Sequence, residues 1–153
     1  MYTASAALYT GSGYSVELPS GSSLSENKSV AYDTYTIKDL QIAQIFPPST
    51  DLARVLKSNN RKMISRIIAA YKSGLEDPTT QDLRVAKERI IKNDKTMIVF
   101  AKFSYINTYI PVYGFFCMTL PAGRDEAIMM SILSLDYKPV AIGPAVKICQ
   151  SIK

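Results

Sequence analysis

Lysine and arginine are the residues of this chain whose types and spacing can do chemistry, and that chemistry is anion binding. The segment from Arg54 to Lys95 holds 11 of the 18 basic residues and five acidic residues, a formal charge of +6, while the whole chain carries +5. Such a segment attracts anionic partners and raises their local concentration, unless it is only the solvated face of a core helix pair. The predicted anion-contacting residues are Arg54, Lys57, Arg61, Lys62, Arg66, Arg84, Lys87 and Lys92.

Catalytic chemistry has few candidate residues. The chain has no histidine, so it lacks the Ser-His-Asp and Cys-His nucleophile systems and histidine-ligated zinc. Gly11-Ser12-Gly13 does not match a nucleotide-binding loop, because no strand is expected before it and no helix-opening glycine follows at the required spacing. The sequence therefore predicts a protein that is not an enzyme, with no catalytic residues, cofactor, metal site or small-molecule substrate.

The cysteines and the apolar runs bear on the compartment. Cys117 and Cys149 lie in apolar surroundings and far apart in the sequence. We interpret them as free buried thiols of a reducing, intracellular compartment, with a disulfide as the less favoured alternative. The longest apolar run, from Tyr109 to Leu120, is interrupted by Pro111 and Gly114 and is shorter than the roughly 20 residues that span a bilayer. Any membrane contact is therefore expected to be peripheral.

The basic segment has the periodicity of amphipathic helices. An apolar stripe within about one third of the circumference predicts a helix from Asp51 to about Ser73, with a weak point at Ser58-Asn59-Asn60 where it can break. A second helix, from Gln81 to about Lys92, is expected to open with a capping box of Thr79 and Asp82. The stripe of the first helix comprises Leu52, Leu56, Met63, Ile67 and Tyr71.

The strongest β signal follows this segment. The runs Thr96 to Ile106 and Tyr109 to Leu120 are rich in β-branched and aromatic residues, and Asn107-Thr108 between them favours an antiparallel hairpin over about 96–120. Both faces of the first strand are partly apolar, so we expect the helices to cover one face and another element to cover part of the other. The alternation places Met97, Val99, Ala101 and Phe103 on one face and Ile98 and Phe100 on the other.

The remaining elements complete an α+β fold. Asp125 to about Leu135 has helical spacing and predicts a third helix, with Asp125 and Glu126 in its first turn, where carboxylates complement the helix dipole. Val140 to Ile152 predicts a last strand or strand pair, and Tyr32 to Ile37 a strand that a short helix or bulged strand follows. The predicted fold is an antiparallel sheet, made of the hairpin with N-terminal and C-terminal strands, packed against two basic amphipathic helices and the third helix.

The N-terminal segment differs in composition from the rest. Residues 1–30 are rich in Ser, Gly and Tyr and have little apolar periodicity, which predicts a flexible or loosely docked arm. Tyr2, Tyr9 and Tyr14 occur at nearly regular intervals and are candidate self-association residues that would dock the arm onto a neighbouring copy. Residues 31–153 are expected to form a single α+β domain.

This order of elements, with the size and charge of the chain, resembles the small basic matrix proteins of negative-strand RNA viruses, the rhabdovirus type in particular. The resemblance covers about 31–153 and implies a structural protein of virion assembly, found in the host cytoplasm and the virion, that bridges membrane, nucleocapsid and copies of itself. Family members often carry a Lys-rich N-terminus and a Pro-Pro-x-Tyr or Pro-Thr-Ala-Pro budding motif. This chain has an uncharged arm, Pro47-Pro48-Ser49-Thr50 and Pro78-Thr79-Thr80 instead, so membrane and nucleocapsid binding would fall to the basic helical face.

The sequence therefore predicts a non-enzymatic, matrix-like assembly protein that self-associates and binds an anionic membrane surface, a nucleocapsid, or both. The alternative is a nucleic-acid-binding protein that contacts RNA phosphates without sequence specificity. Tyr71 is the only aromatic residue of the basic segment, which disfavours recognition of single strands by base stacking.

Overall fold

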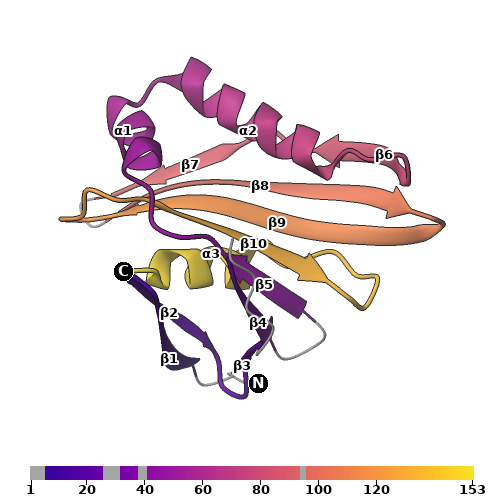
Figure 1. Cartoon of the computed structure of the whole chain (residues 1–153), viewed down its shortest axis with the longest axis horizontal. Helices are drawn as coiled ribbons and strands as arrows, with labels where there is room; N and C mark the ends of the chain where they lie inside the picture. The colour runs from indigo at the N-terminus through magenta and orange to yellow at the C-terminus, as the bar shows by residue number, and fades with distance from the viewer. Residues whose placement is uncertain (1–5, 26–31, 38–40, 94–95) are drawn as a thin grey trace.

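The fold is built around an eight-stranded antiparallel sheet with the strand order β3-β4-β5-β10-β9-β8-β6, in which β7 also pairs with β8 (Figure 1). The computed structural model describes residues 6–25, 32–37, 41–93 and 96–153. The elements are β1 (Ala6–Gly11), β2 (Tyr14–Pro19), β3 (Ser23–Leu24), β4 (Asp33–Ile37), β5 (Gln41–Ile45), α1 (Thr50–Ser58), α2 (Arg61–Leu75), β6 (Thr80–Val85), β7 (Arg89–Lys92), β8 (Thr96–Asn107), β9 (Ile110–Pro121), β10 (Ile128–Ser134) and α3 (Ile142–Ser151).

The β8–β9 hairpin is the longest pairing in the sheet and confirms the predicted hairpin. Its register runs without a shift from Thr96 opposite Pro121 to Asn107 opposite Ile110. The turn is Thr108-Tyr109, one residue later than expected, and both residues have positive φ, as two-residue hairpin turns with the twist of the strands require. The hairpin therefore provides two regularly paired strands of twelve residues, on which the rest of the sheet is built.

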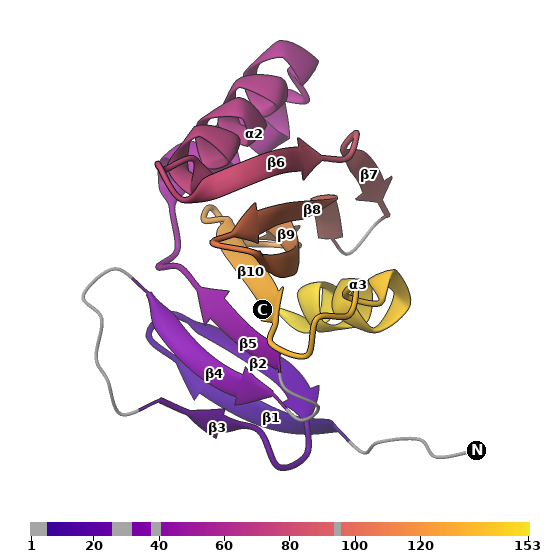
Figure 2. The ribbon, with the colours of Figure 1, turned by 90° about the vertical axis from the view of Figure 1, so that its right-hand side faces the viewer.

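Both faces of β8 are buried, as the alternating pattern predicts. Met97, Val99, Ala101 and Phe103 belong to the core that α1 and α2 cover. Ile98 belongs to a second core on the opposite face, together with residues of α3 and of the separate β1–β2 hairpin. Figure 2 shows α2 on one side of the sheet and α3 on the other. The sheet is thus the middle of three layers.

The predicted first helix breaks at its weak point. Helix α1 ends at Ser58, and Asn59 adopts a left-handed conformation with φ 51°. The Asn60 side chain then accepts hydrogen bonds from the backbone N–H groups of Lys62 and Met63 and caps α2. Asparagine suits both positions, because its short side chain tolerates positive φ and bonds to nearby backbone. Neither helix, nor any other among the described residues, is long and apolar enough to cross a membrane.

The prediction of a second helix is wrong. Residues 80–85 and 89–92 form the strands β6 and β7, which pair one after the other with β8. Asp82 has φ 52° at a register shift within β6 and does not cap a helix. Both strands lie at the edge of the sheet. Their outward-facing positions accommodate the charged residues whose spacing in the sequence suggests a helix.

The third predicted helix and the predicted C-terminal strands are also wrong. Residues 128–134 form β10, which lies between β5 and β9. A strand in the middle of a sheet is buried on both faces, so its sequence shows an apolar run without alternation. The last segment forms α3, with Ala145, Ile148 and Cys149 buried at helical spacing. Pro144 lies in its first turn, where no backbone N–H is needed.

The expectation of a flexible arm is corrected for residues 6–25. β1 and β2 form a hairpin whose Val16 and Leu18 side chains are fully buried against the sheet. The backbone of Ser15 exchanges two hydrogen bonds, of 2.9 and 3.0 Å, with the backbone of Lys153, so the hairpin is tied to the C-terminal end of the chain. Residues 1–5 and 26–31 lie outside the described residues.

The two cysteines are bonded to each other, which overturns the expectation of free thiols. The disulfide joins Cys117 of β9 to Cys149 of α3 and fastens that helix to the sheet. Both side chains are fully buried in the same core. The sequence could not reveal the pairing while residues 140–152 were expected to form strands.

We predict that Leu18→Ala lowers the free energy of unfolding by about 2–4 kcal/mol, because it leaves a cavity under the β1–β2 hairpin. The matched control is Leu8→Ala in the adjacent strand, where the leucine is 67% exposed and the cost should stay below about 0.5 kcal/mol. Urea unfolding of both variants measures this. Equal small effects would mean that the hairpin is not docked.

We also predict that Cys149→Ala lowers the free energy of unfolding by about 2–4 kcal/mol, because the disulfide closes a loop across 32 residues of sequence. Thermal unfolding with and without reductant is the measurement. Reductant should lower the Tm of the wild-type protein and leave that of the variant unchanged. A wild-type Tm that ignores complete reduction would contradict the stabilising role of the bond.

Candidate anion-binding surface

Helix α2 carries the densest group of cations. Its sequence contains four basic residues and no acidic residue. Ile64 and Ile68 point into the core, so at 100° per residue Lys62 and Arg66 point away from it. Arg61, Lys62 and Arg66 are all exposed, and among the described residues none of them forms an ion pair. Two of the predicted anion-contacting residues, Lys62 and Arg66, therefore lie together on the outer surface of the helix, and Arg61 is exposed at its N-terminal end.

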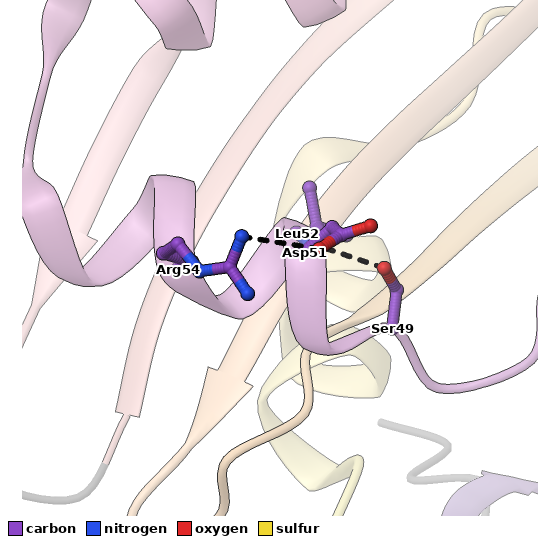
Figure 3. Close-up of polar contacts among 4 residues, drawn as sticks. All are labelled: Ser49, Asp51, Leu52 and Arg54. Carbon is purple, nitrogen blue, oxygen red and sulfur yellow. Dashed lines mark hydrogen bonds and ion pairs between the residues drawn. The ribbon is translucent and has the colours of Figure 1, made fainter.

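The two cations of α1 are compensated by carboxylates. Arg54 lies 3.3 Å from Asp51 in the first turn of the helix, which the Ser49 hydroxyl caps by accepting the N–H of Leu52 (Figure 3). Lys57 Nζ donates to Asp125 Oδ1 over 2.8 Å. These pairs are exposed to solvent, where ion pairs contribute little to stability. They leave both cations within reach of a competing anion.

Asp125 has a different role from the one predicted. It does not lie in the first turn of a helix and instead forms an ion pair with Lys57 of α1. The hydrogen bond and the charge of Lys57 hold the pKa of Asp125 below its usual value. Glu126 similarly accepts a hydrogen bond of 3.2 Å from Arg124. The carboxylates of this turn therefore position cations.

The strand register divides the other predicted cations between the two faces of the sheet. Residues paired directly in an antiparallel sheet point to the same face. Lys92 pairs with Met97 and therefore lies on the side of α1 and α2. Arg84 pairs with Ser104, next to the inward-facing Phe103, and so lies on the opposite side.

Lys87 lies between β6 and β7, in a connection that is adjacent to α2. The neighbouring Glu88 accepts a hydrogen bond of 3.4 Å from the Ser65 hydroxyl of that helix. Six of the predicted anion-contacting residues belong to α1 and α2 or lie on the side of the sheet that these helices cover. We call them the helix-side cations: Arg54, Lys57, Arg61, Lys62, Arg66 and Lys92.

A cavity that sequence reasoning missed lies beside the helix-side cations. It has a volume of about 260 Å³ and receives Lys57 from α1, Lys92 from β7 and Arg124 from the turn between β9 and β10. Arg124 was overlooked because it precedes a segment that was expected to be helical. No local pattern relates three cations at positions 57, 92 and 124. Their proximity follows only from the pairing of the strands.

A second cavity is apolar. It has a volume of about 380 Å³ and opens beside α1 and α2, where Val55, Ile67 and Met129 contribute side chains. Its remaining walls come from Phe46, Pro47, Ser49, Asp51 and Leu52. Among these lining residues, Asp51 contributes the only carboxylate.

Two of the tyrosines proposed for self-association, Tyr9 and Tyr14, make contacts within their own chain. Tyr14 is buried, and its hydroxyl donates to Asp33 over 2.6 Å and lies 2.9 Å from the Tyr35 hydroxyl. Tyr9 donates to the backbone oxygen of Ser22 over 2.7 Å and packs edge-on against Tyr35. Burial strongly raises the pKa of Tyr14, which therefore stays protonated. Tyr2 lies outside the described residues.

Tyr71, the aromatic residue of the basic segment, faces the core. Its ring stacks on Phe116 with centroids 4.4 Å apart, and burial raises its pKa to about 12. It is therefore a packing residue and does not offer a stacking surface to a base.

Neither the candidate metal ligands nor the comparisons with known proteins indicate a further site. Within the part of the chain that the structure describes, no group of three or more Cys, Asp or Glu residues could hold a metal ion. In the comparisons with known proteins, no family model matches the chain and no curated protein sequence matches it.

We predict that Lys57→Gln raises the pKa of Asp125 toward the ordinary value for aspartate, because the variant removes the cation that lowers it. In the wild-type protein the carboxylate stays charged to lower pH, so the ion pair is lost only as pH falls through this lowered pKa. NMR titration of the side-chain carboxyl carbons measures it. Asp77 is the internal control, because Thr79 lowers its pKa and Lys57 does not. A parallel shift of both carboxyls would contradict the assignment.

Proposed function

We propose that this protein is a non-enzymatic, matrix-like assembly protein that binds an anionic membrane surface or nucleocapsid through its helix-side cations and associates with copies of itself. The observation that carries the proposal is the charge of α2: the helix has four basic residues and no acidic residue, and Arg61, Lys62 and Arg66 form no ion pair among the described residues.

The charges of α2 are unfavourable for the folded chain by itself. Lys62 and Arg66 are four residues apart, a spacing at which like charges repel by a few tenths of a kcal/mol. Arg61 and Lys62 occupy the first turn, where the partial positive charge of the helix N-terminus disfavours cations. A bound anionic surface would relieve both repulsions. This arrangement favours anion binding over an ordinary solvated helix face.

Support for self-association comes from one end of the sheet. Tyr109 at the tip of the β8–β9 hairpin is 93% exposed, and Ile110 beside it is 50% exposed. Leu135 and Tyr137, which follow β10, are 50% and 61% exposed. Exposed apolar side chains of this size are typical of contact surfaces. They replace Tyr9 and Tyr14 as candidate self-association residues.

RNA binding is the second candidate, and one observation favours it. On the face opposite α1 and α2, the register places Arg84, Ser104 and Tyr113 in one row across β6, β8 and β9. Cations beside a tyrosine on a sheet face are an arrangement that holds phosphates and stacks bases. RNA binding through this row would not require the cations of α2.

We predict that Lys62→Glu combined with Arg66→Glu lowers binding to vesicles of anionic phospholipid at least tenfold, because each juxtamembrane cation contributes about 1 kcal/mol of attraction. Vesicle flotation at low and high salt, with and without competing RNA, measures it, since salt screens exposed charges. The matched control is Lys138→Glu combined with Lys147→Glu. This variant has the same net charge, and its substitutions lie in the segment after β10 and on α3.

The outcomes separate the candidates. Flotation that is salt-sensitive, lost in the α2 variant and kept in the control supports membrane binding through α2. Equal flotation of the α2 variant and the wild-type protein would rule out this surface. Retained RNA binding by the α2 variant, lost on Arg84→Glu, would place the RNA alternative first.

A further inference from the structure

We infer that the 260 Å³ cavity at the end of the sheet, lined by Lys57, Lys92 and Arg124, is a binding site for a phosphoryl group, either that of a lipid headgroup or that of a free phosphate compound. The inference deepens the proposed function, because it names the anion and the place where two of the helix-side cations, Lys57 and Lys92, would hold it. It adds Arg124, which lies outside the basic segment.

The cavity brings together cations from three separate elements. Lys57 ends the last turn of α1, Lys92 ends β7, and Arg124 follows β9. Like charges that converge on one concave space repel each other more strongly as solvent is excluded. A phosphoryl dianion in the same space would convert this repulsion into attraction. Arg and Lys are also the side chains that donate charge-assisted hydrogen bonds to phosphate oxygens.

The two neighbouring carboxylates do not fill the site. Asp125 pairs with Lys57 and Glu126 pairs with Arg124, but neither carboxylate is among the residues that line the cavity. The Asp125 side chain is 91% exposed, so an entering anion competes with a solvated ion pair of little net stability. Lys92 has no ion-pair partner among the described residues. The cavity therefore keeps a net positive charge.

The walls suit a small polar ligand with an apolar neighbour. Leu56 and Met97, both buried, form the apolar side, and Thr96 contributes a hydroxyl that lies 3.2 Å from the Thr119 hydroxyl. Apolar walls lower the local dielectric constant and strengthen the attraction between cations and a phosphoryl group. The volume of about 260 Å³ lies just below the usual range of small-molecule sites, so the cavity itself suits a phosphoryl group and leaves the rest of a larger ligand outside.

The wall formed by the turn after β9 leaves room for the rest of a ligand. Gly123 has φ 77°, and no described atom other than those of Gly123 and its two chain neighbours lies within 4 Å of the position that a Cβ would take there. A phosphoryl group on the cations could therefore extend past Ala122 and Gly123 into solvent or toward a membrane. The helix-side cations of α2 bind a surface by charge alone, whereas this cavity would select the phosphoryl group itself.

The test is a titration of the full-length protein with inorganic phosphate, followed by backbone amide NMR. We expect saturable shifts centred on Thr96, Gly123 and Arg124. Lys92→Glu and Arg124→Gln should each raise the dissociation constant at least tenfold. Lys62→Glu, which makes the same charge change as Lys92→Glu on the outer surface of α2, should change it less than twofold. Circular dichroism spectra of the variants check that each remains folded.

Vesicles distinguish the two sources of the phosphoryl group. Tighter binding to phosphatidate than to phosphatidylserine vesicles at equal charge, lost in Lys92→Glu, would assign the site to a lipid headgroup. Phosphate binding without that preference would assign it to a free phosphate compound. Shifts that do not saturate, or equal weakening by Lys62→Glu, would overturn the inference. Absence of saturable phosphate shifts, together with vesicle binding that is lost only in the Lys62→Glu, Arg66→Glu variant, would leave the proposed function standing and remove this site.

Discussion

The burial of the β8–β9 hairpin on both faces is the constraint on which the other layers depend. Its twelve-residue register sends Val99 and Phe103 to one face and Ile98 to the other, and neither apolar face can remain exposed to water. Helices α1 and α2 cover one face. Helix α3 and the β1–β2 hairpin cover the other, held by the disulfide and by the pairing of Ser15 with Lys153. The β1–β2 hairpin and α3 therefore both contribute side chains to this core.

The same register decides which cations can act together. A change of one position in β6 or β7 moves a side chain to the other face, so nearness in the sequence does not predict a shared surface. Lys92 joins the helices and Arg84 does not. Arg124, far away in the sequence, is brought to the same cavity as Lys57 because β9 ends beside α1.

The sequence was sufficient where the residue types themselves favour one backbone conformation. Asn59 and Asn60 marked the helix break, and the β-branched runs marked the hairpin. The sequence could not place β10, because a strand between two others loses its alternation and its apolar residues also fit a helix. The disulfide and the position of Arg124 could not be predicted either, because both follow from where β10 and α3 lie. Exposure of the basic residues was predictable, but their grouping required the tertiary structure.

The grouping has an energetic meaning. Cations in the first turn of α2 oppose the helix dipole, Lys62 and Arg66 repel each other, and three cations share a cavity with an apolar side. Each arrangement works against the isolated fold, and an anion relieves each of them. Burial explains the placement of the core residues, including Tyr14 and Tyr35, whereas Tyr109 and Tyr137 remain exposed. Burial does not explain this placement of charge, which the anionic partner proposed above would offset.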